Sequence, residues 1–154
     1  MSQENVERWR ASIEDFLAGT REPDREAMLA KLSELWAPDI EWDVSGLSGP
    51  DIGGVYRGKE AVLGFWRDWL TAWETTHFEY ELVDAGDRVV ILLDQRMRGR
   101  STGIEVPLGK YAQVATFRDG LMVHWKLYMN QLEALEAVGL SKWPAQRDGS
   151  DVAS

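Results

Sequence analysis

The 154-residue chain contains no cysteine, few basic residues and no long apolar run. Without cysteine it forms no disulfide and offers neither a thiolate nucleophile nor a cysteine metal ligand. Acidic residues outnumber basic ones by 26 to 17, giving a net charge of −9. A nucleic-acid partner is therefore not expected, because nucleic acids need a clustered positive surface. The longest aliphatic run, residues 89–93, is far too short to cross a bilayer, so no membrane partner is expected either.

Hydrophobic and aromatic side chains are plentiful: 44% of the residues are hydrophobic and 8 are Trp. This composition excludes low-complexity disorder, and the length fits one domain. We expect that domain to span residues 1–140. The polar segment 141–154 is expected to be a flexible C-terminal tail. Residues 1–10 are polar and charged, unlike a secretory signal, so a cytoplasmic location is the default expectation.

Apolar residues at helical spacing predict three helices in the first half of the chain. They cover residues 4–18, residues 59–75, and the segment from the N-cap Asp24 to the residue before Pro38. A short alternating segment, 40–44, predicts a strand. Residues 45–58 contain five glycines and a proline and predict a loop.

The second half of the chain has the alternation that is typical of strands. Predicted strands cover 78–82, 88–100, 104–118 and 121–129, and a short helix covers 131–138. This order predicts an α+β fold. We expect a cone-shaped, curved mixed or antiparallel sheet with three N-terminal helices packed on its concave face, and a short C-terminal helix. Such a cone is a natural pocket for a small molecule.

Four motifs connect the chain with a known family. They are LWAPDIEW at 35–42, YRGKEAV at 56–62, FRDG at 117–120 and YMNQLEALEAVGL at 128–140. With these motifs the chain resembles, over about residues 4–140, the SnoaL-like polyketide cyclase branch of the nuclear transport factor two-like superfamily. The resemblance implies the fold but not one activity, because the superfamily includes cyclases, isomerases, dehydratases, epoxide hydrolases and non-catalytic binding domains.

One position departs from the family pattern. The resemblance implies a catalytic Asp seven residues after the glycine of the last hairpin, as in the cyclases and the limonene-type epoxide hydrolases. Counted from Gly120, that position is Leu127. The nearest polar side chains, Lys126 and Asn130, cannot act as a carboxylate base, so the standard cyclase mechanism does not transfer to this chain.

The candidate catalytic residues are Asp94, Arg96 and Tyr111, in the long hairpin. If Thr102-Gly103 is a two-residue turn, Asp94 faces Tyr111 and both point into the cone with Arg96. Arg96 would then hold Asp94 ionised, and the carboxylate would serve as a general base.

Two alternatives to this site stay open. A three-residue turn would bring Leu93 and Gln95 inward instead of Asp94, because a one-residue slip reverses every side chain of a strand. Asp94 and Arg96 would also be compatible with an ion pair on the exterior of the sheet.

The expected lining of the cone is aromatic and apolar, which suits a planar hydrophobic ligand. The candidate ligand-binding residues are Trp42, Tyr56, Trp66, Trp69, Trp73, Gln113, Trp125, Leu127 and Met129.

Metal and cofactor sites are not predicted. We interpret His77 and His124 as structural, which leaves neither a histidine metal site nor a Ser-His-Asp arrangement. The glycines of 46–54 do not join a strand to a helix in the manner of a dinucleotide site.

Two functional hypotheses remain, with a third behind them. The first is a cofactor-independent acid/base enzyme of the SnoaL-like type that acts on a small hydrophobic, cyclic molecule by cyclisation, isomerisation, dehydration or epoxide opening. The second is a non-catalytic protein of the same fold that binds such a molecule or serves as a dimeric scaffold. The third, weaker hypothesis is a domain for protein partners only. A homodimer is expected in any case, through the convex sheet face that carries His124, Lys126 and Tyr128.

Overall fold

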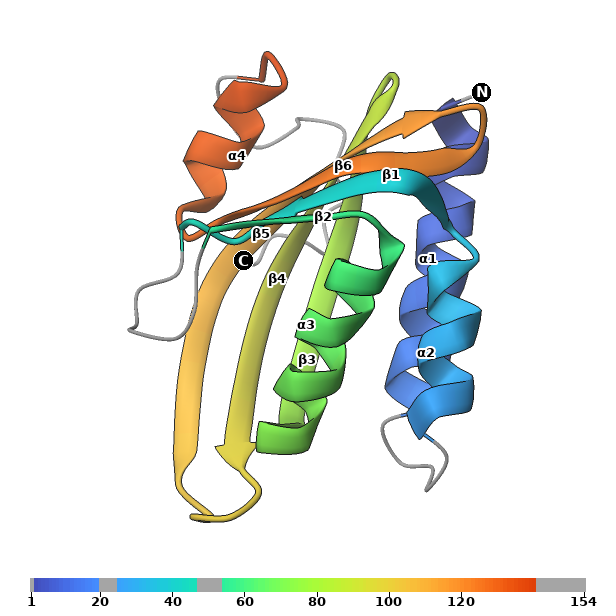
Figure 1. Cartoon of the computed structure of the whole chain (residues 1–154). Helices are drawn as coiled ribbons and strands as arrows, with labels where there is room; N and C mark the ends of the chain where they lie inside the picture. The colour runs from blue at the N-terminus through green and yellow to red at the C-terminus, as the bar shows by residue number, and fades with distance from the viewer. Residues whose placement is uncertain (1, 20–24, 47–53, 141–154) are drawn as a thin grey trace.

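The structure is a computed structural model that describes residues 2–19, 25–46 and 54–140 (Figure 1). Its helices are α1 (Ser2–Gly19), α2 (Arg25–Ser33), α3 (Lys59–Ala72) and α4 (Gln131–Ala137). Its strands are β1 (Trp36–Asp43), β2 (Val55–Arg57), β3 (Trp73–Ala85), β4 (Arg88–Gly99), β5 (Glu105–Arg118) and β6 (Leu121–Tyr128). None of the described helices is both long and apolar enough to span a membrane.

The six strands form one mixed sheet in the order β2-β1-β6-β5-β4-β3. Neighbouring strands are antiparallel except for β1 and β6, which are parallel. The sheet is strongly curved and unclosed, with α1, α2 and α3 on one side and α4 on the other (Figure 1). We call these sides the concave and the convex face. The predicted α+β fold, with three helices on the concave face and a short C-terminal helix, is confirmed.

The core consists of two apolar clusters, one on each face of the sheet. The concave cluster joins the three N-terminal helices to the strands, and the convex cluster lies beneath α4. Residues 89–93 of β4 contribute to both, with Val89, Ile91 and Leu93 in the first and Val90 and Leu92 in the second. Because β4 is buried on both faces here, its apolar run is continuous rather than alternating.

Several element boundaries differ from the sequence-based predictions. Helix α2 ends at Ser33, and Trp36 already pairs with Met122 of β6 in the sheet. The residue before a proline avoids the helical conformation, which favours extended backbone ahead of Pro38. Helix α3 ends at Ala72, because Trp73 is extended and begins β3.

A further difference is that a strand, β2, lies within the predicted loop and pairs with β1. The predicted N-cap Asp24, part of the predicted loop (47–53) and the predicted tail (141–154) lie outside the described residues. The expected single domain over 1–140 stays a proposal.

Candidate ligand-binding site

A cavity of about 90 Å³ lies between the three N-terminal helices and the concave face of the sheet. This volume is the space open to the centre of a water-sized sphere. One water molecule needs roughly 10–15 Å³ of such space, so the cavity has room for several. Most of its lining side chains are aromatic or aliphatic. Among the described residues, the polar groups in the lining are those of Ser12, Gln95, Tyr111, Gln113 and the tryptophans, and none of the lining residues is Asp, Glu, His, Lys or Arg.

Two helices supply one wall of the cavity through residues at helical spacing. Helix α1 contributes Trp9, Ile13 and Phe16, which recur every three to four residues along one face. Helix α3 contributes Phe65, Trp66 and Trp69. Since Phe65 and Trp69 are four residues apart, their rings stack, with centroids 5.8 Å apart. The contribution of α1 was missed as a binding surface, although the spacing of its apolar residues was visible in the sequence.

Three indole rings form the aromatic centre of the lining. Trp42 of β1 and Trp125 of β6 lie on neighbouring parallel strands and pair in register, with ring centroids 4.1 Å apart. Trp66 of α3 stacks on both, at 5.7 Å from Trp42 and 5.6 Å from Trp125. These flat surfaces suit a planar apolar ligand.

A chain of hydrogen bonds crosses the sheet beside these rings. Trp125 Nε1 donates to Gln113 Oε1 at 2.9 Å, and the Tyr111 hydroxyl donates to Gln95 Oε1 at 2.5 Å. Gln95 Nε2 donates in turn to Thr75 Oγ1 at 3.0 Å. Burial raises the pKa of the Tyr111 phenol above its ordinary value, although a hydrogen bond with Gln113 acts in the opposite direction. Tyr111 is therefore a neutral donor near pH 7 and not a base.

Two indole donors in the lining have no partner. The Nε1 atoms of Trp42 and Trp66 are shielded from solvent, and neither has a hydrogen-bond acceptor among the described residues. A buried N–H group without a partner costs free energy, so such groups are uncommon in folded proteins.

The predicted positions of Asp94 and Arg96 are wrong. Tyr111 pairs with Leu93, and Asp94 pairs with Lys110. Leu93 and Gln95 line the cavity, and neither Asp94 nor Arg96 is among its lining residues. Leu93 and Gln95 thus point inward, as expected for a three-residue turn, but the hairpin has a different turn.

The physical reason is a β-bulge. The hairpin closes through four residues, 100–103, since Gly99 N donates to Ile104 O. Further along, the register shifts by one residue between Arg96↔Pro107 and Gln95↔Gly109, which leaves Leu108 as the extra residue. Gly109 has φ 76°, in the left-handed region that glycine tolerates. As a result Leu108 and Tyr111, three residues apart, both line the cavity.

A second bulge lies on the other side of β4. The β3–β4 register shifts between Thr75 and His77, so Thr76 is the extra residue. Thr75 can therefore bond to Gln95 while Phe78, three residues on, lines the same cavity. Bulges often redirect side chains next to functional sites, and here two of them frame the buried Gln95.

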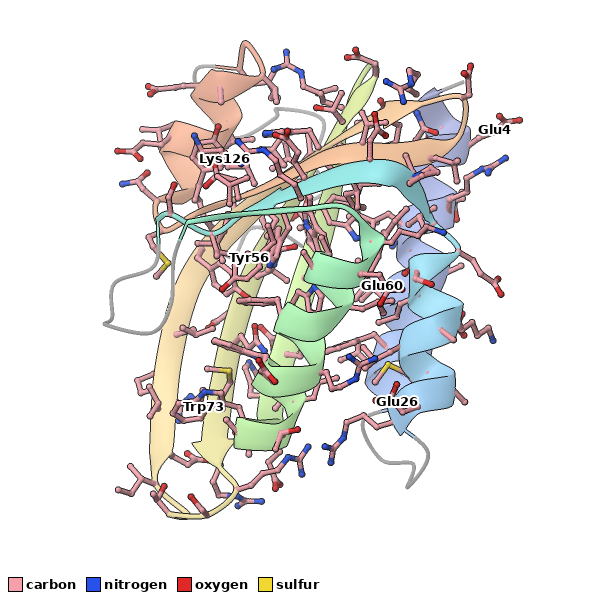
Figure 2. All side chains as sticks on the ribbon, in the orientation of Figure 1. Glu4, Glu26, Tyr56, Glu60, Trp73 and Lys126 are labelled. Carbon is pink, nitrogen blue, oxygen red and sulfur yellow. The ribbon has the colours of Figure 1, made fainter. Side chains whose placement is uncertain are left out.

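Three of the candidate ligand-binding residues lie outside the cavity lining. Tyr56 (labelled in Figure 2) belongs to β2 and packs on Phe65, with ring centroids 5.1 Å apart, but it is not among the residues that line the cavity. Trp73 begins β3 and contacts Trp69 with centroids 6.2 Å apart. Met129 follows the end of β6, next to the N-cap Asn130 of α4, and is 40% exposed.

The other candidates do line the cavity: Trp42, Trp66, Trp69, Gln113, Trp125 and Leu127, together with Tyr111. Leu127 occupies the position at which the resemblance implies a catalytic Asp, and it is 5% exposed. An apolar side chain thus stands inside the cavity at this position.

A mixed group of potential metal ligands lies on the convex face. Single ligand atoms of His77, Glu79 and Asp94 lie within 4.8 Å of one another. Arg96 and Lys110 pair across the strands with His77 and Asp94, and their positive charges oppose a bound cation. The expectation of no metal site stays a prediction.

The fold is that of the nuclear transport factor 2-like proteins. A protein of this type, of unknown function, from Burkholderia pseudomallei is 24% identical, with a TM-score of 0.64 over 88% of this chain and 98% of that one. A protein from Bacillus subtilis that is named as an isomerase has a TM-score of 0.66 at 17% identity, over 92% and 99% of the two chains. A protein from Mesorhizobium loti, named as a SnoaL-like polyketide cyclase, has a TM-score of 0.54 at 22% identity, over 75% and 97%.

The sequence model of the SnoaL-like domain matches residues 6–125, so the chain belongs to the SnoaL-like domain family. No curated protein matches the sequence. The identities with the solved structures are low enough that these likenesses establish the fold and leave the activity open.

Proposed function

We propose that the protein binds a small, flat, electrically neutral hydrophobic molecule in the cavity without transforming it. The observation that carries the proposal is the lining: aromatic and aliphatic side chains surround the cavity, and none of the described lining residues carries a charge near pH 7. General acid/base catalysis needs a group whose pKa lies near the working pH. Tyr111 does not meet this condition, since burial raises the pKa of its phenol still further from pH 7.

Charge should decide which molecules enter. An ion that leaves water for an apolar cavity without a counter-charge loses much solvation free energy. The net charge of the chain, −9, disfavours anions further. The bound molecule is accordingly expected to be neutral.

The experiment compares naphthalene with 2-naphthoate, which share a ring system and differ by one carboxylate. We expect naphthalene to quench tryptophan fluorescence and raise the melting temperature, and 2-naphthoate to do neither at the same concentration. Equal binding of the two compounds, or binding of neither, would overturn the proposal. Conversion of a bound neutral compound into a product, followed by mass spectrometry, would favour the acid/base enzyme instead.

We also propose a homodimer formed through the convex face. His124, Lys126 and Tyr128 alternate on this face of β6, and Lys126 lies on the side of the sheet that carries α4 (Figure 2). Leu132 of α4 and Met129 before it are 37% and 40% exposed. Light scattering should give about twice the chain mass of 17.5 kDa at tens of micromolar, and a mass of one chain would contradict the proposal.

A further inference from the structure

A serine hydroxyl in the cavity wall carries an inference about the chemistry and orientation of the ligand, which rests on the proposed function. Ser12 of α1 lines the cavity and is half-buried. Within the described ranges of the chain its hydroxyl has no hydrogen-bond partner, and the unpartnered side-chain atoms that are shielded from solvent are the Nε1 atoms of Trp42 and Trp66. The Ser12 hydroxyl is thus both unpartnered and open to a small molecule.

The position of Ser12 on α1 turns it towards the interior. Side chains three and four residues apart lie next to each other on a helix. Trp9, three residues before Ser12, and Phe16, four residues after it, both line the cavity. Asp15, three residues after Ser12, forms an ion pair with Lys31 of α2, with Oδ1 and Nζ 3.4 Å apart. Ser12 therefore lies on the flank of α1 between the cavity and the contact with α2.

Other helical hydroxyl groups of the chain are used differently. Serine and threonine in helices commonly donate to a carbonyl oxygen three or four residues back. Thr71 of α3 donates to Arg67 O at 2.8 Å. Ser33 of α2 donates to Ala30 O at the same distance. Ser12 makes no such bond with the described part of the chain, so its donor and its acceptor capacity are both left for a molecule in the cavity.

Ser12 also lies close to the aromatic centre of the lining. Trp9 contacts Trp125, with ring centroids 6.4 Å apart. Phe16 contacts Trp66, with ring centroids 6.0 Å apart. Since Ser12 stands between Trp9 and Phe16 on α1, a flat ring that rests against the indoles can bring a substituent to its hydroxyl.

We propose that Ser12 is a specificity-determining residue, which hydrogen-bonds to an oxygen substituent, a hydroxyl or a carbonyl, on the neutral ring compound that the cavity binds. A serine hydroxyl donates one hydrogen bond and accepts two, so either kind of oxygen can pair with it. A hydrocarbon of the same shape fills the space but leaves Ser12 unpaired. The pairing also fixes which end of the ligand faces α1.

The test uses indane, 2-indanol and 2-indanone, which share a ring system and differ in one oxygen substituent. Their dissociation constants with the full chain are measured by isothermal titration calorimetry near pH 7. In Ser12→Ala, the ratio of the dissociation constant of indane to that of at least one oxygen compound should fall about two- to tenfold. The reason is that the substitution removes a hydrogen bond that only the oxygen compound can make.

Ser33→Ala is the matched control. It removes a hydroxyl from α2 at a residue outside the cavity lining, so the ratios should stay unchanged. Ser12→Ala is expected to fold, because alanine is the residue that favours a helix most and the substitution removes no hydrogen bond within the described structure. The melting temperature of the variant checks this expectation.

The outcomes separate this inference from the proposed function. If indane binds but neither oxygen compound does, the inference is wrong and the apolar binding site stands. The same conclusion follows if the compounds bind and Ser12→Ala leaves both ratios unchanged, or changes them no more than Ser33→Ala does. If none of the three compounds binds, the proposed function fails, and the inference fails with it.

Discussion

Around residues 93–96 of β4, the two faces of the sheet differ in charge although the same strands form them. On the concave face Leu93 and Gln95 of β4 border an uncharged cavity. On the convex face their neighbours Asp94 and Arg96 lie among charged residues of the adjacent strands, such as Glu79 and Lys110. Since side chains alternate along a strand, one register decides the side on which every charge lies. The charge of a strand in the sequence therefore says little about the charge of a pocket that the strand lines.

The two apolar clusters also have different roles. The concave cluster surrounds space, and its rings are both core and cavity wall. The convex cluster fills the contact between the sheet and α4, and its residues are not among those that line the concave cavity. Loss of packing on either face should lower stability, but only loss on the concave face should also change binding.

The largest expected effect is that of Trp42→Ala. Trp42 is 1% exposed and contacts Phe65, Trp66 and Trp125, so the substitution should lower the free energy of unfolding by about 3–5 kcal/mol. It should also weaken naphthalene binding at least tenfold. Urea denaturation and fluorescence titration measure the two quantities.

Leu135→Ala is the matched variant on the convex face. Leu135 is a fully buried residue of α4 that packs in the convex cluster, and the substitution should cost about 2–5 kcal/mol. Naphthalene affinity of the folded protein should nevertheless stay unchanged. A parallel loss of affinity in this variant would mean that the two clusters are coupled, and the comparison of the faces would break.

A smaller effect is expected from two substitutions at adjacent positions of β4. Gln95→Leu leaves the buried Tyr111 hydroxyl without its acceptor and should cost about 1–3 kcal/mol. Asp94→Leu introduces the same side chain on the convex face and should change stability by no more than about 0.5 kcal/mol. Chemical denaturation of both variants tests the register directly; equal effects, or a larger effect at Asp94, would contradict it.

The smallest expected effect is that of pH. Because no charged group lines the described part of the cavity, naphthalene affinity should be constant from about pH 5 to 9. Burial raises the folded-state pKa of Tyr111, so the contribution of this residue to stability is complete below about pH 10 and is lost as pH rises above it.

Tyr111→Phe separates the effect of pH on stability from its effect on naphthalene affinity. The variant should lack the part of the alkaline loss of stability that comes from Tyr111, as measured by denaturation at several pH values. If the naphthalene affinity of the natural chain changes between pH 5 and 9, a group that titrates in this range lies at the site. That result would contradict an uncharged concave face and favour the acid/base enzyme over the binding protein.

Much of the fold was predictable because periodicity reports burial directly. The apolar spacing of Trp9, Ile13 and Phe16 predicts α1 and the face that it buries. The alternation of Phe78, Tyr80 and Leu82 predicts both β3 and the side of the sheet on which they lie. The Asp119-Gly120 turn predicts the last hairpin, in which both residues have positive φ.

The candidate site was only partly predictable. Trp66 and Trp69 were found because helical spacing places them, and Trp42 and Trp125 because strand alternation does. Asp94 and Arg96 were misplaced because nothing in the local sequence distinguishes a regular hairpin from one with a bulge at Leu108. Trp73 was assigned to a helix that ends one residue earlier, since Trp fits either structure at a boundary.

The sequence by itself thus determined the elements, their order and the aromatic character of the cavity, since these depend on residue type and on spacing over a few positions. Only the tertiary structure decided which face of β4 borders the cavity. That choice depends on two single-residue bulges, at Thr76 and Leu108, which appear only in the pairing of β3 and β5 with β4. One extra residue in each neighbouring strand is enough to bring Gln95 rather than Asp94 to the cavity.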